Sequence, residues 1–200
     1  MTYSCQTNAQ TYTIATSLGN IQIQLYDQTP LHKANFETLV EKQAYDSVLF
    51  HRIIEGFMIQ TGDLSTKPGA SRTASADGKL IPAEFVKEYI HKKGALAAAR
   101  TGDQVNPEKK SSPTQFYIVQ GRTFADNELQ QMEEFGKKTW TPEQKEIYKT
   151  IGGTPFLDQD YTVFGEVVVG LDVVDKIAAL PTGRGDYPLS DIRILSITKD

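Results

Sequence analysis

The sequence predicts a mainly β protein built as an antiparallel barrel with capping helices. About eight short runs rich in β-branched and aromatic residues are separated by turn residues. Helical patterns occur near each end of the chain, and no repeated strand-helix-strand unit lies between them. This order is typical of antiparallel barrels and argues against a parallel sheet.

The length, composition and net charge indicate one soluble globular domain. The chain has 200 residues, of which 39% are hydrophobic and 23% charged, so it is long enough for one well-buried core. The formal net charge of -4 and the isoelectric point near 5.4 argue against nucleic acid or an acidic membrane surface as the main partner. No apolar run approaches the length of a membrane span.

The reactive and metal-ligating residues are few. Cys5 is the single cysteine, which excludes an internal disulfide and a thiolate metal site. With only three histidines, we expect no zinc site and no other cofactor. The opening residues MTYSCQTNAQ lack the pattern of a signal peptide, so we expect a cytoplasmic protein with a flexible tail over residues 1–11. The alternative is an exported or lipid-anchored protein in which Cys5 belongs to a trimmed signal region.

The chain begins with a β-hairpin followed by a helix. Residues 12–17 and 21–26 are β-rich runs, and the residues Leu18-Gly19-Asn20 form the turn between them. Thr29 and Pro30 then supply the N-cap and the first helical position of an amphipathic helix that extends to about residue 42.

A second hairpin, FHRIIEGFMIQTGD, mixes polar and apolar side chains unusually. Period two places Arg52 on one face with Phe50 and Ile54, and it places Met58 on one face with Gln60. An arginine, a methionine and a glutamine among large apolar groups indicate a binding surface. At this point a plain hairpin with a snorkelling arginine is an equal alternative.

The middle of the chain holds two further strand candidates. Residues 64–79 are a polar surface loop, and order returns at residues 81–85. The run GALAAAR over residues 94–100 fits either a helix or a strand close to another backbone. The run QFYIV is a strong strand that places Gln115 and Tyr117 on one face, which makes both candidates for the face of the arginine.

Residues 122–153 predict a helical hairpin inserted between strands. Thr141-Pro142-Glu143-Gln144 resembles a capping box that opens its second helix, and Trp140 is expected as a partly buried anchor at its turn. After it, residues 162–169 predict a strand, Asp172 is expected to cap a short helix, and residues 191–198 predict the last strand.

The motif FHRIIEGFMIQTGD resembles the cyclophilins, a family of peptidyl-prolyl cis-trans isomerases. Four further motifs follow in the family's order: GALAAAR, SSPTQFYIV, FLDQDYTVFGEVVVGLDVVDKI and DYPLSDIRI. The resemblance extends from about Tyr12 to Asp200, apart from the inserted hairpin. It implies a single cyclophilin-like domain over residues 1–200, with an eight-stranded antiparallel closed barrel capped by two α-helices.

The resemblance also implies a set of site residues. It makes Arg52 the catalytic arginine, with Phe57 and Gln60 beside it as catalytic neighbours. The substrate-binding residues that it implies are Met58, Ala99, Arg100, Gln115, Tyr117, Phe156, Leu157 and Tyr161.

At four of these positions the chain departs from the common pattern of the family. Tyr117 replaces a phenylalanine, Arg100 an asparagine, Phe156 a tryptophan and Tyr161 a histidine. Because an indole N–H donor is lost at position 156, binding of cyclosporin-type inhibitors is expected to be weakened.

The resemblance implies a monomeric enzyme that rotates X-Pro peptide bonds in proline-containing polypeptides and so assists protein folding. A cyclophilin-like module that binds proline peptides with little turnover is the alternative, and the acidic balance disfavours a nucleic-acid-binding barrel. His51 alternates away from Arg52 and is expected to be structural, while Asp63 after Gly62 is expected to be a turn residue.

Overall fold

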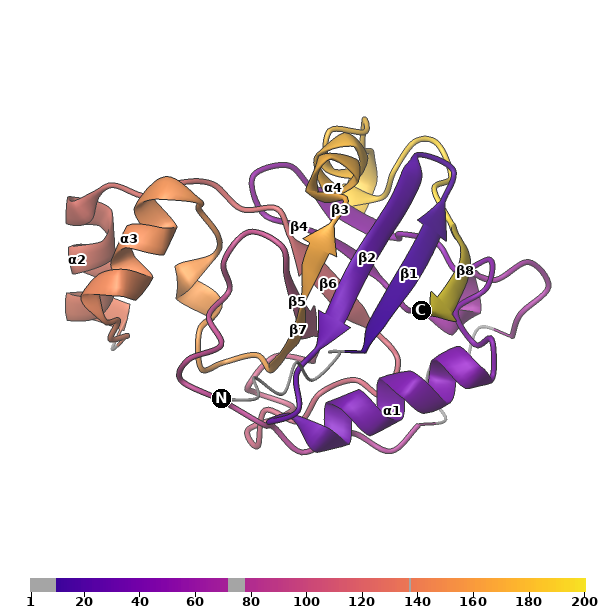
Figure 1. Cartoon of the computed structure of the whole chain (residues 1–200), viewed down its shortest axis with the longest axis horizontal. Coiled ribbons are helices and arrows are strands. Elements are labelled where there is room, and N and C mark those ends of the chain that lie inside the picture. Colours follow the sequence, from indigo (N-terminus) through magenta and orange to yellow (C-terminus); the bar gives the residue numbers. More distant parts are fainter. Residues whose placement is uncertain (1–9, 72–77, 137) are drawn as a thin grey trace, which may run out of the picture.

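Eight antiparallel strands form one curved sheet in the computed structural model, which describes residues 10–71, 78–136 and 138–200 (Figure 1). The spatial order is β3-β4-β6-β5-β7-β2-β1-β8. The predicted tail up to residue 9, with Cys5, and residues 72–77 of the polar loop lie outside the described residues. The strands are β1 (Thr11–Thr16), β2 (Gly19–Leu25), β3 (Arg52–Ile54), β4 (Met58–Thr61), β5 (Ala95–Ala98), β6 (Phe116–Val119), β7 (Val163–Val169) and β8 (Ile194–Lys199).

The two faces of the sheet bury different side chains. Alternation along each strand sends one set inward to a main core to which all eight strands contribute, including Ile59 of β4 and Ile118 of β6. The residues between them point outward into a second, smaller cluster that contains Met58, Tyr117 and Val119. The outer face of β4, β5 and β6 therefore carries a second apolar cluster, while the inner face supplies the main core.

Helices α1 (Pro30–Glu41) and α4 (Leu171–Ala178) cover the two ends of the curved sheet (Figure 1). Phe36 of α1 and Val174 of α4 are fully or almost fully buried in the main core. Thr29 is the N-cap residue of α1 and Pro30 its first helical residue, as predicted, but the Thr29 hydroxyl donates to the Tyr26 carbonyl and makes no capping bond to the helix. Asp172 is not a cap: Gly170, at φ 95°, precedes α4, and Asp172 lies in its first turn.

The sheet forms a half-barrel. Among the described residues, the end strands β3 and β8 do not pair with each other along their lengths. The segment before β3 instead contacts the residues around the start of β8, where Leu49 and Arg193 form an isolated bridge and the Ile194 amide donates to the Val48 carbonyl at 2.9 Å. The Phe50 amide donates to the Ile192 carbonyl at 2.9 Å in the same region.

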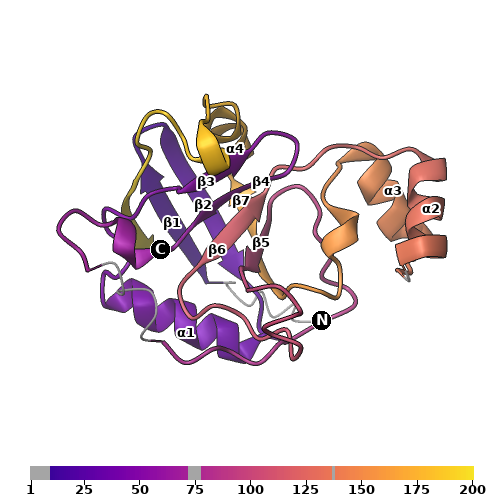
Figure 2. The same ribbon diagram turned by 180° about the vertical axis from the view of Figure 1, so that it is seen from behind.

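Helices α2 (Asp126–Gly136) and α3 (Pro142–Thr150) lie side by side, away from α1 and α4 (Figures 1 and 2). The capping box predicted at Thr141 is present, since its side chain accepts from the Gln144 amide and Gln144 reaches back to the Thr141 amide. The two helices have a core of their own, formed by Ile90, Phe124, Leu129, Trp140 and Tyr148. Residues 122–153 are called the α2–α3 segment below.

Other local predictions need correction or completion. The first turn is Ser17-Leu18, because β2 already starts at Gly19. Of the two alternatives predicted for GALAAAR, the strand is the one found: its residues Ala95–Ala98 form β5, and all four are buried. Phe50 does not share a face with Arg52, because regular strand geometry begins only at Arg52 and the Phe50 ring enters the main core.

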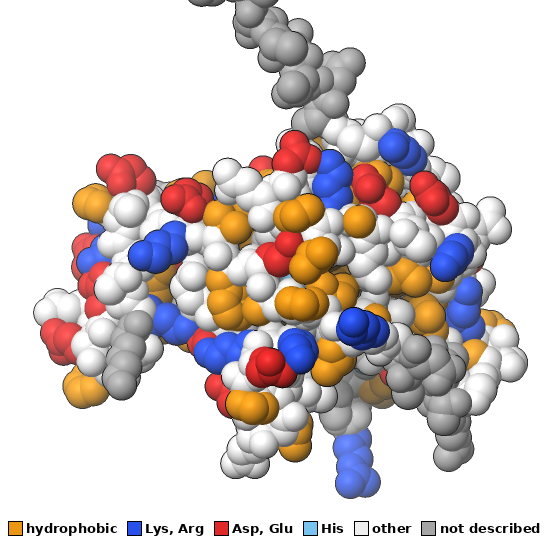
Figure 3. Space-filling model, turned by 90° about the horizontal axis from the view of Figure 1, so that it is seen from below, with side chains coloured by type: hydrophobic (Ala, Val, Ile, Leu, Met, Phe, Trp, Pro, Cys, Tyr) orange, Lys and Arg blue, Asp and Glu red, His pale blue; other side chains and the backbone are white. Residues whose placement is uncertain are grey.

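The surface carries charges of both signs. Figure 3 shows one face of the molecule, on which basic and acidic side chains are interspersed around apolar ones. The described side chains of this face therefore do not create a field of a single sign. No helix in the described ranges combines the length and the apolar character needed to cross a membrane.

Stability is expected to fall as the pH drops below about 6.5. Burial lowers the pKa of His32 and, independently, that of His51. The unfolded chain therefore binds protons near pH 6.5 that the folded chain does not bind, which favours unfolding at lower pH. For each histidine, the free energy of unfolding is expected to change by at most about 1.4 kcal/mol per pH unit. Urea denaturation at pH 7.5, 6.5 and 5.5 measures it, and constant or rising stability on acidification would contradict the expectation.

Candidate functional site

Nine of the eleven residues expected at the site line one cavity of about 100 Å³ on the outer face of the sheet. They come from β3, the β3–β4 turn, β4, the residues after β5, β6 and the segment before β7. The lining residues are Arg52, Phe57, Met58, Gln60, Ala99, Arg100, Tyr117, Leu157 and Tyr161. Distant parts of the chain thus meet in one groove.

Strand register places the polar groups of the groove in a row. Arg52 of β3 is paired with Gln60 of β4, and Gln60 is paired with Tyr117 of β6. Residues in register on adjacent strands project to the same face, so the three side chains stand next to one another. Period two makes Tyr117 a candidate for the face of Arg52 and Gln60, and the strand register places it there.

The two glutamines contact each other. Gln60 donates through Nε2 to Oε1 of Gln115 at 3.1 Å. Gln115 directly precedes β6 and does not line the cavity itself. It therefore holds Gln60 at the floor of the groove from outside the cavity.

Arg52 has a partner that the sequence did not reveal. Its Nε lies 3.2 Å from Oδ2 of Asp186, and both side chains are about two-fifths exposed, at 42% and 44%. Asp186 ends the 3-10 turn Arg184–Asp186 and has a positive φ of 61°. An ion pair this exposed contributes little to stability, because water screens it. Its effect is to orient the guanidinium along the groove.

Aromatic and aliphatic side chains form the walls of the groove. The rings of Phe57 and Phe156 lie 5.7 Å apart between centroids, and Phe156 is 45% exposed at the edge. Leu157, from the 3-10 turn Pro155–Leu157, packs against the same outer cluster. On the other side the rings of Tyr117 and Tyr161 meet edge to face at 6.0 Å. These side chains give the cavity apolar walls, which suit a small ring, beside the polar groups of Arg52 and Gln60.

Arg100 closes one end of the groove. Its guanidinium carbon lies 4.5 Å from the centroid of the Tyr161 ring. Its Nε donates to the Asp160 carbonyl at 2.6 Å, and Nη1 donates to Oδ1 of Asp103 at 2.6 Å. The side chain is only 4% exposed, and its Nε and Nη1 donors are engaged, so it is a fixed part of the wall. Arg52, with 42% side-chain exposure, is the more accessible of the two arginines.

The remaining chemistry of the groove is simple. His51 and Asp63 do not line the cavity, and Asp63 accepts from the Ser65 amide at 3.0 Å as the cap of the 3-10 turn Leu64–Thr66. Within the described parts of the chain, no group of three or more His, Cys, Asp or Glu residues is placed to hold a metal ion. What the groove offers is a guanidinium, an amide pair and an apolar pocket.

Known proteins are similar to this chain in sequence. The family described as "Cyclophilin type peptidyl-prolyl cis-trans isomerase/CLD" matches residues 11–199. A Staphylococcus saprophyticus protein provisionally named a peptidyl-prolyl cis-trans isomerase is 36% identical over 184 residues, which cover 91% of this chain and 87% of that protein. A Staphylococcus aureus relative with the same provisional name is 35% identical, with the same coverage.

A solved structure agrees with the fold. The crystal structure of a cyclophilin type peptidyl-prolyl cis-trans isomerase from Cryptosporidium parvum superposes with a TM-score of 0.69 and 22% identity, covering 96% of this chain and 97% of that one. The same Cryptosporidium protein has also been crystallised in the presence of the dipeptide Ala-Pro. Because the matching family extends over almost the whole chain and the relatives match most of their own length, this chain belongs to the cyclophilin-type peptidyl-prolyl cis-trans isomerase family.

Proposed function

We propose that the groove binds proline-containing polypeptides and that Arg52 catalyses rotation about the X-Pro bond. The observation that carries this proposal is the row Arg52, Gln60 and Tyr117, which stands over the apolar pocket. A proline ring fits between the aromatic walls, and the polar row faces the peptide group that must turn. The Cryptosporidium structure obtained in the presence of Ala-Pro is consistent with a ligand of this kind.

The reaction breaks no covalent bond. The bond before proline rotates against an uncatalysed barrier of roughly 18 to 20 kcal/mol, because the twisted amide loses its resonance. In the twisted form the imide nitrogen gains a localised lone pair that accepts a hydrogen bond. Among the described residues, the hydrogen bond of Arg52 uses only Nε, so its Nη groups are available as donors. No proton transfer is required.

Arg52 supplies only a part of the acceleration. Bringing a step of tens of seconds into the millisecond range takes about five decades, or roughly 7 kcal/mol. A charge-assisted hydrogen bond contributes about 1.5 to 3 kcal/mol. The rest is assigned to the pocket, which holds the proline ring between Phe57, Met58 and Leu157 while the preceding residue turns. Gln60, held by Gln115, positions the substrate backbone.

A proline-peptide isomerisation assay tests the proposal. The wild-type chain is expected to accelerate the exchange of an Ala-Pro peptide far above its uncatalysed rate. A wild-type rate equal to the uncatalysed rate, together with measurable binding of the same peptide, would favour the alternative of a binding module. Absence of both would reject the groove as a proline site.

We also propose that the barrel is closed and that the α2–α3 segment is an insertion. The backbone bonds that join residues 48–50 to residues 192–194 are proposed to close the barrel, and slow hydrogen exchange at the Phe50 amide tests this. Residues 122–153 are proposed to be an insertion, because Arg122 and Gly153 form an antiparallel bridge and so bring the two ends of the segment together.

Replacing Phe156 by tryptophan is expected to strengthen binding of a cyclosporin-type inhibitor. Phe156 is 45% exposed at the edge of the groove, so a larger ring fits there without disturbing the core. The indole N–H restores a donor, worth about 0.5 to 1.5 kcal/mol, or roughly 2- to 12-fold in the dissociation constant. Isothermal titration calorimetry measures the dissociation constant. The control is Leu189→Trp, which places a tryptophan at another exposed apolar position. Equal affinities of Phe156→Trp and the wild type would contradict the expectation.

A further inference from the structure

Behind the groove lies a buried carboxylate with an unusually complete set of donors. Asp158 is 3% exposed. Its Oδ1 accepts from the backbone amide and from Nδ1 of His91, both at 2.8 Å. Its Oδ2 accepts from Nε1 of Trp140 at 2.7 Å and from the hydroxyl of Tyr148 at 2.6 Å. Two bonds to each oxygen use the full acceptor capacity of a carboxylate.

His91 connects this carboxylate to the groove. The ring is fully buried, and its Nε2 lies 3.0 Å from the hydroxyl of Tyr117. Because the carboxylate of Asp158 only accepts, Nδ1 of His91 is its donor, and Nε2 is placed to accept from the Tyr117 hydroxyl. Burial raises the pKa of Tyr117 well above its usual value, so this hydroxyl keeps its proton and donates. The carboxylate of Asp158, both ring nitrogens of His91 and the hydroxyl of Tyr117 then all have hydrogen-bond partners.

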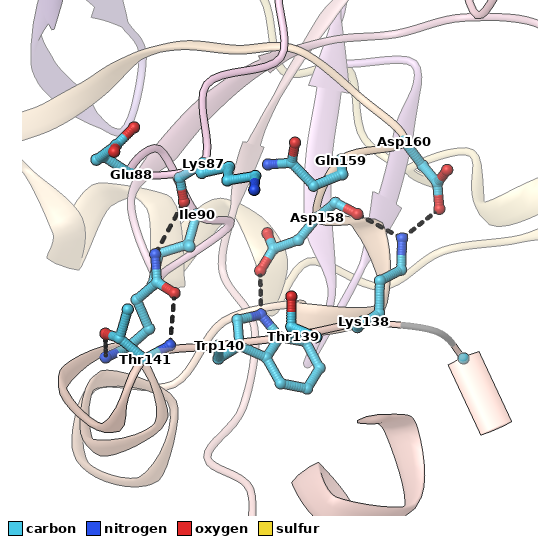
Figure 4. A pocket seen from close by; sticks show the side chains of 12 residues that line it. Lys87, Glu88, Ile90, Lys138, Thr139, Trp140, Thr141, Asp158, Gln159 and Asp160 are labelled. Carbon is cyan, nitrogen blue, oxygen red and sulfur yellow. Dashed lines mark hydrogen bonds and ion pairs between the residues drawn. The ribbon is translucent and has the colours of Figure 1, made fainter. Parts of the chain in front are cut away.

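The network joins two parts of the molecule. Trp140 and Tyr148 belong to the α2–α3 segment, while Tyr117 belongs to β6 and lines the proline pocket. Figure 4 shows Trp140 directed at Asp158. Both residues line a second cavity, of about 640 Å³. Leu157 and Tyr161 line the groove, whereas residues 158–160 line this cavity. One short stretch of chain thus separates the α2–α3 segment from the pocket.

We propose that Trp140, Tyr148, Asp158 and His91 are positioning residues, through which the α2–α3 segment fixes the Tyr117 ring in the proline pocket. This inference rests on the proposed function of the groove. A phenylalanine at position 117 would be held by packing alone, whereas the tyrosine hydroxyl anchors the far end of the ring. Because the Tyr117 side chain is already held in place, it loses less conformational entropy when the proline ring binds. It also keeps the geometry that the twisted peptide requires.

A double-mutant cycle tests the network. Trp140→Phe removes the N–H donor but keeps an aromatic ring in the hydrophobic core of the α2–α3 segment. Tyr117→Phe removes the other end of the network. Each single substitution is expected to lower kcat/KM for an Ala-Pro peptide by about two- to tenfold, the range for one hydrogen bond. The double variant is expected to lose no more than the larger single loss, because the two groups act as a unit.

A control separates positioning from simple destabilisation. Tyr12→Phe makes the same chemical change in β1, where a buried tyrosine donates to Oε1 of Glu37 at 2.8 Å, far from the groove. It is expected to lower the melting temperature and leave kcat/KM unchanged. All variants are compared at a temperature where circular dichroism shows them fully folded. If Trp140→Phe behaves like Tyr12→Phe, or if the losses in the cycle add, the proposal is overturned.

The cycle also distinguishes failure of this inference from failure of the proposed function. If the wild type shows no turnover, the proposed catalytic function fails. The wild type and the three variants are then compared by their affinity for an Ala-Pro peptide, measured by NMR titration. Coupled losses of affinity in Trp140→Phe and Tyr117→Phe would then support the positioning network on its own. Unchanged affinity in Trp140→Phe would overturn it.

Discussion

Replacing Arg52 by alanine is expected to lower kcat for an Ala-Pro peptide by about 10- to 150-fold, with a much smaller change in peptide affinity. This range corresponds to one charge-assisted hydrogen bond formed only when the amide is twisted. The ground state is held mainly by the apolar pocket, which the substitution leaves in place. Line-shape analysis of the peptide by NMR measures the exchange rate, and a titration measures the affinity.

Two further variants sharpen this test. Arg52→Lys keeps the charge but loses the planar set of donors, so an intermediate rate is expected. Arg122→Ala removes a guanidinium of similar exposure, paired with Glu128 outside the groove, and is expected to leave the rate unchanged. A loss confined to peptide affinity would show that Arg52 binds the ground state only. A rate of Arg52→Ala equal to the wild-type rate would remove the arginine from the mechanism.

Local sequence signals predicted most of the elements. The capping box at Thr141, the helix that starts at Pro30 and the β-rich runs all depend on residues close together in the chain. The open alternatives and the errors arose where tertiary packing decides. GALAAAR fits either a helix or a strand by its local pattern, and pairing with β6 and β7 decides for the strand, because that burial outweighs the local helix propensity. Phe50 breaks the expected alternation because it fills the main core.

The site was predictable only in part. Period two and the family resemblance together named all the residues that line the cavity around Arg52. Their partners depend on contacts between positions far apart in the chain: Asp186 is 134 residues from Arg52, and Asp158 is 67 residues from His91. No local sequence pattern predicts contacts between residues so far apart in the chain. A lone buried histidine also has the same sequence signature whether it is isolated or part of a network.

Replacing Asp158 by alanine is expected to lower the free energy of unfolding by about 3 to 5 kcal/mol. The substitution leaves four buried donors without their acceptor: two from His91, one from Trp140 and one from Tyr148. Urea denaturation followed by fluorescence measures the change, because Trp140, the single tryptophan, lies at the affected position. Asp172→Ala, at a carboxylate with 70% side-chain exposure, is the matched control and is expected to cost under about 1 kcal/mol.

The location of this loss is as informative as its size. The α2–α3 segment has its own small hydrophobic cluster, whereas all eight strands share the main core. Asp158→Ala is therefore expected to release amide protection first in α3, with β1 and β2 still protected, because local opening needs less free energy than global unfolding. Hydrogen exchange followed by NMR resolves the two. Equal loss of protection in α3 and β1 would mean that Asp158 stabilises the whole fold, and a loss under about 1 kcal/mol would mean that water replaces its bonds.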